Sequence, residues 1–397
     1  MARKQNAVKI CLWTHVQNEA GIIERMLQSA ADYIDYWVIV DNGSTDGTQD
    51  IIKNFFDKEG IPGQLYQSEI GWKGHGINRQ HSWDFLCKTN HDCQYILRMD
   101  ADEGLAVDDD FDWSCIGGHD SYNVIFVSGN YCIPRTWLWD FQYEYYWQDD
   151  EAHETIHRKD GGHMVQQQLP FGFRQIPLGT GQSYYDPIKY VKDVLKLEIQ
   201  LHERLRDGSF TNDEYYHLYY LCRSFNYTNF FLEDENVYKF FPYGRDSLEM
   251  FLNRGIYYYN KLIETFGNHW VHYYLRGNLH GQLNNIEQQY KDYETSYDMA
   301  PHRAEAACCL FRYYRDTKKL DLATKWANVL DNIKLDFEKD PYDVELDKYP
   351  DKNADLRKEL DEFMGKSKTY KNVIDYSLNI KNRSVITIQY GKNIRQK

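Results

Sequence analysis

The sequence lacks three patterns that would each point to a particular class of protein. Its eight cysteines form no CxxC pair and show no zinc-ligand spacing, so neither a zinc site nor a disulfide framework is indicated. No apolar segment reaches the ~20 residues that a membrane helix needs, and the run from Val8 to Val16 is broken by Lys9, Thr14 and His15. We therefore expect reduced, buried cysteines, a cytoplasmic location and no membrane span.

Basic stretches are also missing from the 397 residues. The net charge is −14 at pH 7 and no run of Lys and Arg forms a stripe, which disfavours nucleic acid as a partner. A ligand that carries phosphate would therefore need a metal ion or a few placed cations. The first predicted strand is followed by THVQNEAG rather than GxGxxG, which argues against a dinucleotide-binding dehydrogenase.

Short apolar strands alternate with helical patterns up to about residue 180. This alternation predicts an α/β domain over residues 1–180, with a mostly parallel, Rossmann-like sheet covered by helices on both faces. The expected strands are residues 8–16, 36–40, 63–68 and 94–99, and the expected helices begin at Glu19, Thr48 and Gly76.

Helical signals dominate the second half, which we expect to be an all-α domain over residues 181–397. Asp186 and Pro187 are typical of a helix start, and Gly208 stands where that helix would end. The run Thr211–Glu214 has the form of a capping box that opens the next helix.

A repeat of 34 residues is visible within this half. Aligning Trp270 with Ala304 puts Gly277 at a small position, Tyr293 at an aromatic one and Pro301 at the closing proline. The pattern resembles the tetratricopeptide repeat, in which small and large side chains of paired helices pack together. A helical bundle with a coincidental period is the alternative. The helical half is also a candidate surface for a homodimer.

Acidic residues follow two of the predicted strands. Asp41 ends the strand of VIVDNGSTDGT, and Asp100 and Asp102 follow the strand of YILRMDADE. Ligands of open α/β sheets collect at the carboxyl ends of strands, so these groups predict one shared site. Crowded carboxylates need a neutralising cation, for which Mg²⁺ or Mn²⁺ is suited because both prefer oxygen ligands. The alternatives are an acidic surface turn at Asp100 and a helix-capping role for Asp46.

Four motifs in this order resemble the family-two glycosyltransferases of the GT-A fold. They are Asn18–Glu19 after the first strand, VDNGSTDGT, a helix that contains Arg79, and MDADE. The resemblance covers roughly the first 160 residues. Glycosyltransferases with tetratricopeptide-like helices after the GT-A domain are a known arrangement, so both halves point the same way.

The resemblance implies roles for seven residues in binding the donor. A departure is Gln80, which stands where Asn often follows the arginine. In the implied assignment, Asp41 contacts the base or ribose, Asp46 shapes the same pocket, Thr14 and Glu19 lie beside the nucleoside, Arg79 faces the diphosphate, Asp102 is the direct metal ligand and Asp100 holds ribose or a metal-bound water.

A general base is expected further along, in the acidic run of residues 148–154. Related enzymes with helical repeats carry a similar His-Glu pair after an aromatic stretch, so the resemblance implies Glu154 as the base and Asp150 as the second candidate. His153 would be an additional metal or diphosphate ligand, unless it is a member of a surface ion pair. The preceding tryptophans, Trp137, Trp139 and Trp147, would either contact the acceptor or pack in the core.

Together these observations predict a metal-dependent, inverting glycosyltransferase that uses a UDP-sugar. Its acceptor would be a hydroxyl of a glycan, a lipid-linked saccharide or a protein. A sugar nucleotidyltransferase is one alternative, although residues 12–18 lack the glycine-rich basic loop usual in that class. A non-catalytic interaction protein with a relic first domain is the other, and the presence of both Asp100 and Asp102 argues against it.

Overall fold

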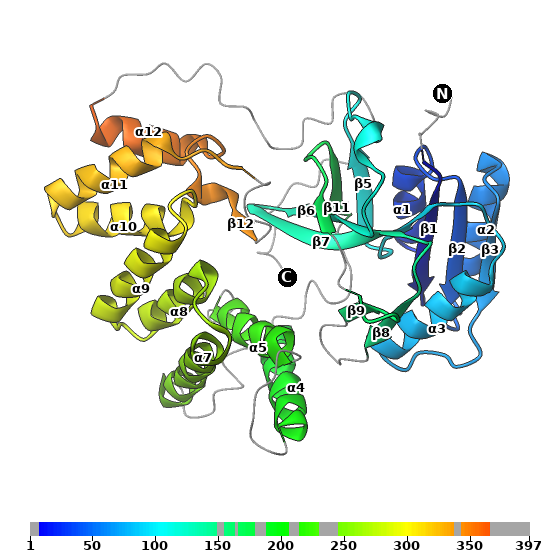
Figure 1. Ribbon diagram of the computed structural model, residues 1–397, viewed down its shortest axis with the longest axis horizontal. Coiled ribbons are helices and arrows are strands. Elements are labelled where there is room, and N and C mark those ends of the chain that lie inside the picture. Colours follow the sequence, from blue (N-terminus) through cyan, green and yellow to red (C-terminus); the bar gives the residue numbers. More distant parts are fainter. Residues whose placement is uncertain are drawn as a thin grey trace, which may run out of the picture.

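The computed structural model describes residues 8–148, 155–162, 166–178, 188–205, 214–229, 245–336 and 343–365. Its largest element is a sheet of ten strands, and a second, two-stranded sheet lies apart from it (Figure 1). The smaller sheet pairs β8 (Tyr145–Gln148) with β9 (Thr155–Arg158). In order across the large sheet the strands are β3 (Gly63–Gln67), β2 (Tyr36–Asp41), β1 (Ile10–Val16), β4 (Tyr95–Arg98), β7 (Tyr131–Asp140), β6 (Ser121–Ser128), β11 (Phe173–Pro177) and β5 (Glu103–Val107), with β10 (Gln166–Gln168) beside β6 and β12 (Val344–Glu345) beside β7.

The four strands β3, β2, β1 and β4 are mutually parallel. They are connected by the helices α1 (Ile23–Ala30), α2 (Thr48–Glu59) and α3 (His75–Lys88), since parallel neighbours need a crossover. The predicted α/β class is therefore confirmed. From β7 onward the sheet becomes mixed, because β7 is antiparallel to β4, β6 and β12, and β11 is antiparallel to β5.

Successive residues of β1 belong to two different cores, one on each face of the sheet. Ile10 and Leu12 pack with side chains of α1 and α2, whereas Cys11 and Trp13 pack with Trp83 of α3. All four β1 side chains are fully buried. This alternation follows from the two-residue period of a strand and places helices on both faces, as the sequence predicts.

The second half of the chain is helical, which confirms its predicted class. Figure 1 shows its helices in an arc that leads away from the sheet and back toward it. The predicted caps at 186–187 and 211–213 lie outside the described residues. The helices are α4 (Lys189–Arg204), α5 (Glu214–Asn229), α7 (Arg245–Phe266), α8 (Trp270–Gln282), α9 (Ile286–Met299), α10 (Glu305–Asp316), α11 (Leu320–Asn332) and α12 (Ala354–Phe363), with short 3₁₀ turns at Trp113–Cys115 and Leu346–Lys348.

Gly277 and Tyr293 make the small-to-large contact that the repeat pattern predicts. Gly277 lies on α8 and Tyr293 on α9, and a Cβ atom added at Gly277 would lie 2.8 Å from Cε1 of Tyr293. Only glycine allows this approach. The assignment of the helices to the tetratricopeptide class stays a prediction, but its most specific packing contact is present.

The expectations about cysteines and membrane helices have mixed outcomes. All eight cysteines are free, and most are buried, but Cys87 on α3 is exposed, so the prediction of burial is wrong there. Within the described ranges, none of the helices combines the length and the apolar character needed to cross a bilayer.

The segment from Asp343 to Tyr349 connects the helical arc to the sheet. Val344 pairs with Cys132 of β7, so the chain adds a short strand to a sheet whose other members precede it by more than 160 residues. The same segment reaches α10, because Glu305 accepts hydrogen bonds from the backbone N–H of Glu345 (3.3 Å) and from the hydroxyl of Tyr349 (3.1 Å). The sequence analysis did not predict this return.

Glu305 is buried together with its cationic partner, Arg303. Their ion pair measures 2.9 Å from Nη2 to Oε1, and both side chains are almost inaccessible to solvent. Arg303 also donates to the backbone carbonyl of Asp343 and lies over the ring of Trp270 at 4.4 Å. This polar group thus joins α8, α10 and the returning segment.

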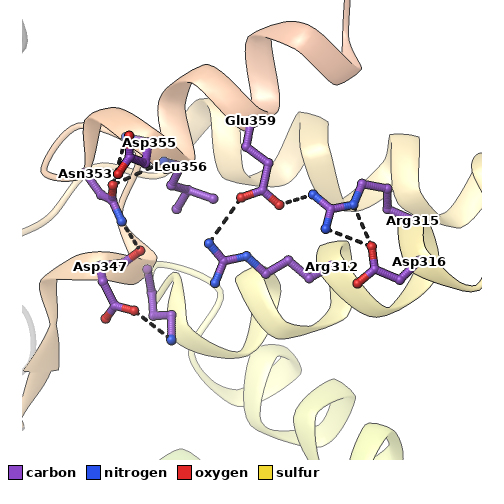
Figure 2. A network of polar contacts seen from close by, with 9 residues as sticks. Arg312, Arg315, Asp316, Asp347, Asn353, Asp355, Leu356 and Glu359 are labelled. Atoms are coloured by element: carbon purple, nitrogen blue, oxygen red, sulfur yellow. Dashed lines mark hydrogen bonds and ion pairs between the residues drawn. The ribbon is translucent and has the colours of Figure 1, made fainter.

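A second, more exposed network joins α10 to α12 (Figure 2). The carboxylate of Glu359 accepts from Arg312 at 3.2 Å and from Arg315. Asn353 caps α12 by accepting from the backbone N–H groups of Asp355 (3.0 Å) and Leu356 (3.1 Å). These contacts fix the last described helix against the array.

Burial should make Glu305 far more important for stability than Glu359. Removing one member of a buried pair strands the other charge, so we expect Glu305→Ala to lower the free energy of unfolding by about 3–5 kcal/mol. Glu359→Ala breaks a partly exposed network and should cost about 1 kcal/mol or less. Urea denaturation of both variants checks this, and equal losses would contradict the structural role of Glu305.

Candidate active site

The loops that follow β1 and β2 are joined by hydrogen bonds between them. The backbone N–H of Asn18 donates to Oγ of Ser44 (2.8 Å), and Oδ1 of Asn18 accepts from the N–H of Thr45 (2.9 Å). The N–H of Glu19 donates to Oγ1 of Thr48 (2.8 Å). Asn18 adopts a positive φ of 57°, which asparagine tolerates better than most residues. Glu19 is therefore held beside the loop of β2.

Asp41 stands at the end of β2 and is fully buried. Its Oδ2 accepts hydrogen bonds from the N–H groups of Gly43 (3.2 Å) and Ser44 (3.0 Å) and from the amides of Gln49 (2.7 Å) and Gln67 (3.1 Å). The structure thus gives this carboxylate a turn-forming role. Its role in binding the nucleoside stays a prediction.

Asp46 and Thr14 also lie close to these loops, Asp46 in a bend and Thr14 within a strand. Oδ1 of Asp46 accepts from the N–H and the hydroxyl of Thr48 at 3.1 and 2.6 Å, and Oδ2 accepts from the N–H of Ala20 at 3.0 Å. Asp46 thus precedes the N-cap residue of α2, Gly47, and binds the first residue of the helix rather than capping it from the N-cap position. Thr14 is buried inside β1, two residues before the strand ends.

Asp100 follows β4 and faces two guanidinium groups. Its Oδ1 lies 2.5 Å from Nη2 of Arg98, and its Oδ2 lies 4.0 Å from Nη2 of Arg79. Burial would raise the pKa of Asp100, but Arg98 and Arg79 outweigh it and hold that pKa below its usual range. Arg79 therefore lies beside this turn, and its predicted role at the diphosphate stays a prediction.

The next carboxylates of the turn have the opposite electrostatic character. Burial, followed by repulsion from Asp100, raises the pKa of Asp102 and raises that of Glu103 to about 8. Glu103 accepts from the backbone N–H of Asp100 at 3.2 Å and from Nη1 of Arg135 at 2.8 Å. Glu103 therefore stabilises the conformation of the turn through these two contacts.

The carboxylates around Glu19 come from the loops after β2 and β4, so the three loops converge. Burial raises the pKa of Glu19 to about 7, and the charges of Asp102, Asp46 and Asp100 contribute in that order. Because β1 lies between β2 and β4, the carboxyl ends of these strands meet at one edge of the sheet. The structure thus brings Glu19, Asp46, Asp100 and Asp102 near one another, whereas their functional roles stay predictions.

The described side chains would supply only some of the ligands that a hard divalent cation needs. Among the described residues, no group of three or more His, Cys, Asp or Glu side chains is arranged to hold a metal. Mg²⁺ in nucleotide sites often takes only one or two carboxylates, with phosphates completing the shell. After burial, repulsion between neighbouring carboxylates contributes to the raised pKa values of Glu19 and Asp102. A bound cation would relieve this repulsion, so the residues present fit a divalent cation.

Tryptophans support the arginines of the site. The guanidinium of Arg98 lies 4.4 Å from the ring centre of Trp137 and 5.9 Å from that of Trp147, and Arg79 lies 5.5 Å from Trp147. Trp137, Trp139 and Trp147 are all buried, which favours packing over acceptor contact. Arg98 and Arg135 were missed in the sequence, where nothing distinguishes an arginine in a strand from a surface residue.

Gln80 links this cluster to α3. Its Oε1 accepts from the backbone N–H of Trp147 in β8 at 2.7 Å, which gives the departure from the family pattern a structural role. The predicted base candidates Glu154 and Asp150, and the predicted ligand His153, lie outside the described residues. They belong to the connection between β8 and β9.

Comparisons with known proteins match one family model over part of the chain. Residues 14–174 match the family model for glycosyl transferase family 2, about two fifths of the chain. No curated protein is significantly similar in sequence. Among solved structures, the mannosyltransferase PcManGT of Pyrobaculum calidifontis, in complex with GDP-Man and Mn²⁺, shares 12% identity over 56% of this chain and 76% of its own, with a TM-score of 0.34. The inositol-1-phosphate CTP transferase of T. maritima shares 10% identity over 46% of this chain and 95% of its own, with a TM-score of 0.23.

The raised pKa of Glu19 predicts a pH-dependent stability. The native state binds this proton more tightly than the unfolded chain, so the stabilisation is present below about pH 4.5 and is lost as the pH rises through about 7. In metal-free buffer, Glu19→Gln should therefore gain stability relative to the wild type between pH 4.5 and 7. Urea denaturation at several pH values measures the difference. Glu24→Gln, on the exposed face of α1, is the matched control, and a difference for Glu19→Gln that stays constant with pH would contradict the raised pKa of Glu19.

Proposed function

We propose that this glycosyltransferase, whose family 2 domain spans residues 14–174, is metal-dependent and uses a nucleotide-sugar donor, with a UDP-sugar as the first candidate. The observation that supports the proposal is the convergence of Glu19, Asp46, Asp100 and Asp102 from three neighbouring strand ends. A nucleotide diphosphate with a bound cation matches such an acidic edge that has a few arginines beside it.

Arg79 and Arg98 are the cationic side chains of the described site that stand closest to Asp100. The leaving diphosphate gains negative charge when its bond to the sugar breaks, and fixed positive groups stabilise that charge without reorganising. Arg79 is the better placed of the two, because Arg98 is almost completely buried and already engaged with the carboxylate. We assign Arg79 to the diphosphate, as the resemblance implies.

Asp102 and Asp100 would hold the cation, with His153 as a further candidate ligand. When bound, Mn²⁺ or Mg²⁺ supplies charge neutralisation for the diphosphate oxygens. Arg98 keeps Asp100 ionised and oriented. Asp41, Asp46, Thr14 and Glu19 are assigned to the nucleoside side of the same pocket.

The acceptor hydroxyl must lose its proton as the new bond forms. We assign Glu154 as the general base, with Asp150 as the second candidate, and the reaction as inverting, because a base on the side opposite the diphosphate gives that outcome. Support comes from the position of β8, whose Trp147 lies against Arg79 and precedes this segment.

The remaining assignments concern the rest of the chain. We place the catalytic domain at residues 1–180 and the helical, tetratricopeptide-like domain at 181–397, with an acceptor that is a glycan, a lipid-linked saccharide or a protein. A cytoplasmic location agrees with eight free cysteines. The helical domain is also the candidate surface for a homodimer.

A donor screen tests the proposal directly. UDP- and GDP-sugars are compared for slow hydrolysis and for a rise in melting temperature, with Mn²⁺ and with EDTA. A ligand at about 100 times its Kd should stabilise the native state by about 2.7 kcal/mol. We expect a UDP-sugar with Mn²⁺ to give the largest rise, and no response to any nucleotide sugar would contradict the assignment.

Asp102→Asn should then lower metal-stimulated turnover about a hundredfold or more, the effect of removing one charge-stabilising group from a transition state. The matched control is Asp110→Asn, an exposed aspartate further along the same acidic stretch, which should retain wild-type activity. Full activity of Asp102→Asn would remove this residue from the site.

A further inference from the structure

Trp72 is an exposed aromatic residue beside the candidate site. Its side chain is 41% exposed, whereas the other nine of the ten tryptophans, all within the described ranges, are buried or half-buried. It lies in the loop between β3 and α3, which follows the carboxyl end of a parallel strand. A single exposed aromatic residue is common on protein surfaces, so it is the fixed position of Trp72 beside the site that carries the argument.

The loop that carries Trp72 is fixed to the end of β2 through Asn78. This fully buried side chain accepts from the backbone N–H of Lys73 (2.7 Å) and donates to the carbonyl of Gly71 (2.7 Å), the two neighbours of Trp72. Its Nδ2 also donates to Oδ1 of Asn42 at 2.8 Å.

The backbone partners fix the orientation of the Asn78 amide, because an N–H must meet oxygen and a carbonyl must meet nitrogen. The bond to Asn42 is therefore fixed in direction as well. Asn42 directly follows Asp41, which is assigned to the nucleoside. Gly71 makes the loop possible, since its φ of +63° is a conformation that side chains disfavour. The ring of Trp72 is thus held next to the nucleoside end of the site.

Two histidines complete the surroundings of the ring. The centre of the Trp72 ring lies 5.9 Å from that of His15, at the end of β1, and 5.0 Å from that of His75, at the start of α3. The contact with His75 is edge-to-face, at 90° between the planes. Trp72 therefore rests on the tips of the strands while much of its surface remains open.

We propose that Trp72 provides the stacking surface for the nucleobase of the donor. This inference rests on the proposed function and names a residue for base binding. An exposed indole suits a nucleobase because every base has a flat π-face, and stacking is insensitive to which base is present. Trp72 would thus supply affinity, whereas polar groups near Asp41 would distinguish one base from another.

The test compares a ligand that has a base with one that lacks it. UDP and inorganic pyrophosphate, each with Mn²⁺, are titrated by calorimetry into the full-length wild type, Trp72→Ala and Trp72→Phe. Alanine should weaken UDP binding roughly tenfold or more, the loss expected for one stacked base, and leave pyrophosphate unchanged. Phenylalanine retains a flat face and should bind UDP within a few-fold of wild type. Tyr257→Ala, at a more exposed aromatic residue on α7, is the control.

The outcomes separate this inference from the proposed function. If the wild type binds neither UDP nor GDP, the proposed function fails. If the wild type binds UDP and Trp72→Ala binds it equally well, only the role of Trp72 is overturned. Equal weakening of UDP and pyrophosphate would also overturn it, because the effect would then lie in the loop rather than in the base. With an active donor, the alanine variant should raise KM and change kcat little.

Discussion

Repulsion between carboxylates is the constraint around which the amino-terminal half is built. The parallel order of β2, β1 and β4 leaves no alternative to bringing their acidic loops to one edge. Like charges at that edge oppose folding, and after burial they contribute to the raised pKa values of Glu19 and Asp102. The protein compensates with hydrogen bonds from backbone N–H groups to Asp41 and Asp46 and with two arginines at Asp100. The uncompensated remainder is the reason for proposing a cation site at this edge.

The antiparallel part of the sheet holds the arginines of the site, Arg98 and Arg135, in fixed positions. Pairing of β7 with β4 and β6 brings Trp137 under Arg98, and Arg135 to Glu103. A guanidinium over an indole contributes about 0.5–2 kcal/mol, depending on how far it is removed from water. More important than this energy is the fixed position, since an arginine clamped on a ring cannot turn to other partners. The site therefore depends on β7, although none of the charged residues predicted for the site lies there.

Those features could be predicted from the sequence that depend on one short segment of the chain. A strand that ends in Asp41 or Asp100, followed by turn residues, is local information, and these positions and their approach to one another could be predicted. The roles of Arg98, Arg135 and Glu103 could not, because they depend on contacts across β4, β5 and β7. Strand β12 was missed for a different reason: two residues are too few to show a period, and their pairing is decided by Glu305 and Arg303 far along the chain. The burial of Trp147 likewise follows from a hairpin that docks on α3.

The returning segment bears on whether the helical half acts as an independent interaction module. Repeat arrays commonly use a long surface to bind partners. Here polar side chains of two helices are already engaged with the chain's own segment: Arg223 of α5 pairs with Asp343, and Glu305 of α10 binds the backbone of Glu345. Val344, which lies between Asp343 and Glu345, pairs with Cys132 of β7 and so joins the large sheet. A movement of the helices relative to the sheet would have to break either the buried Glu305 group or the pairing of Val344 with Cys132 of β7. The helical array is thus held in a fixed relation to β7, and β7 in turn supports the arginines at Asp100.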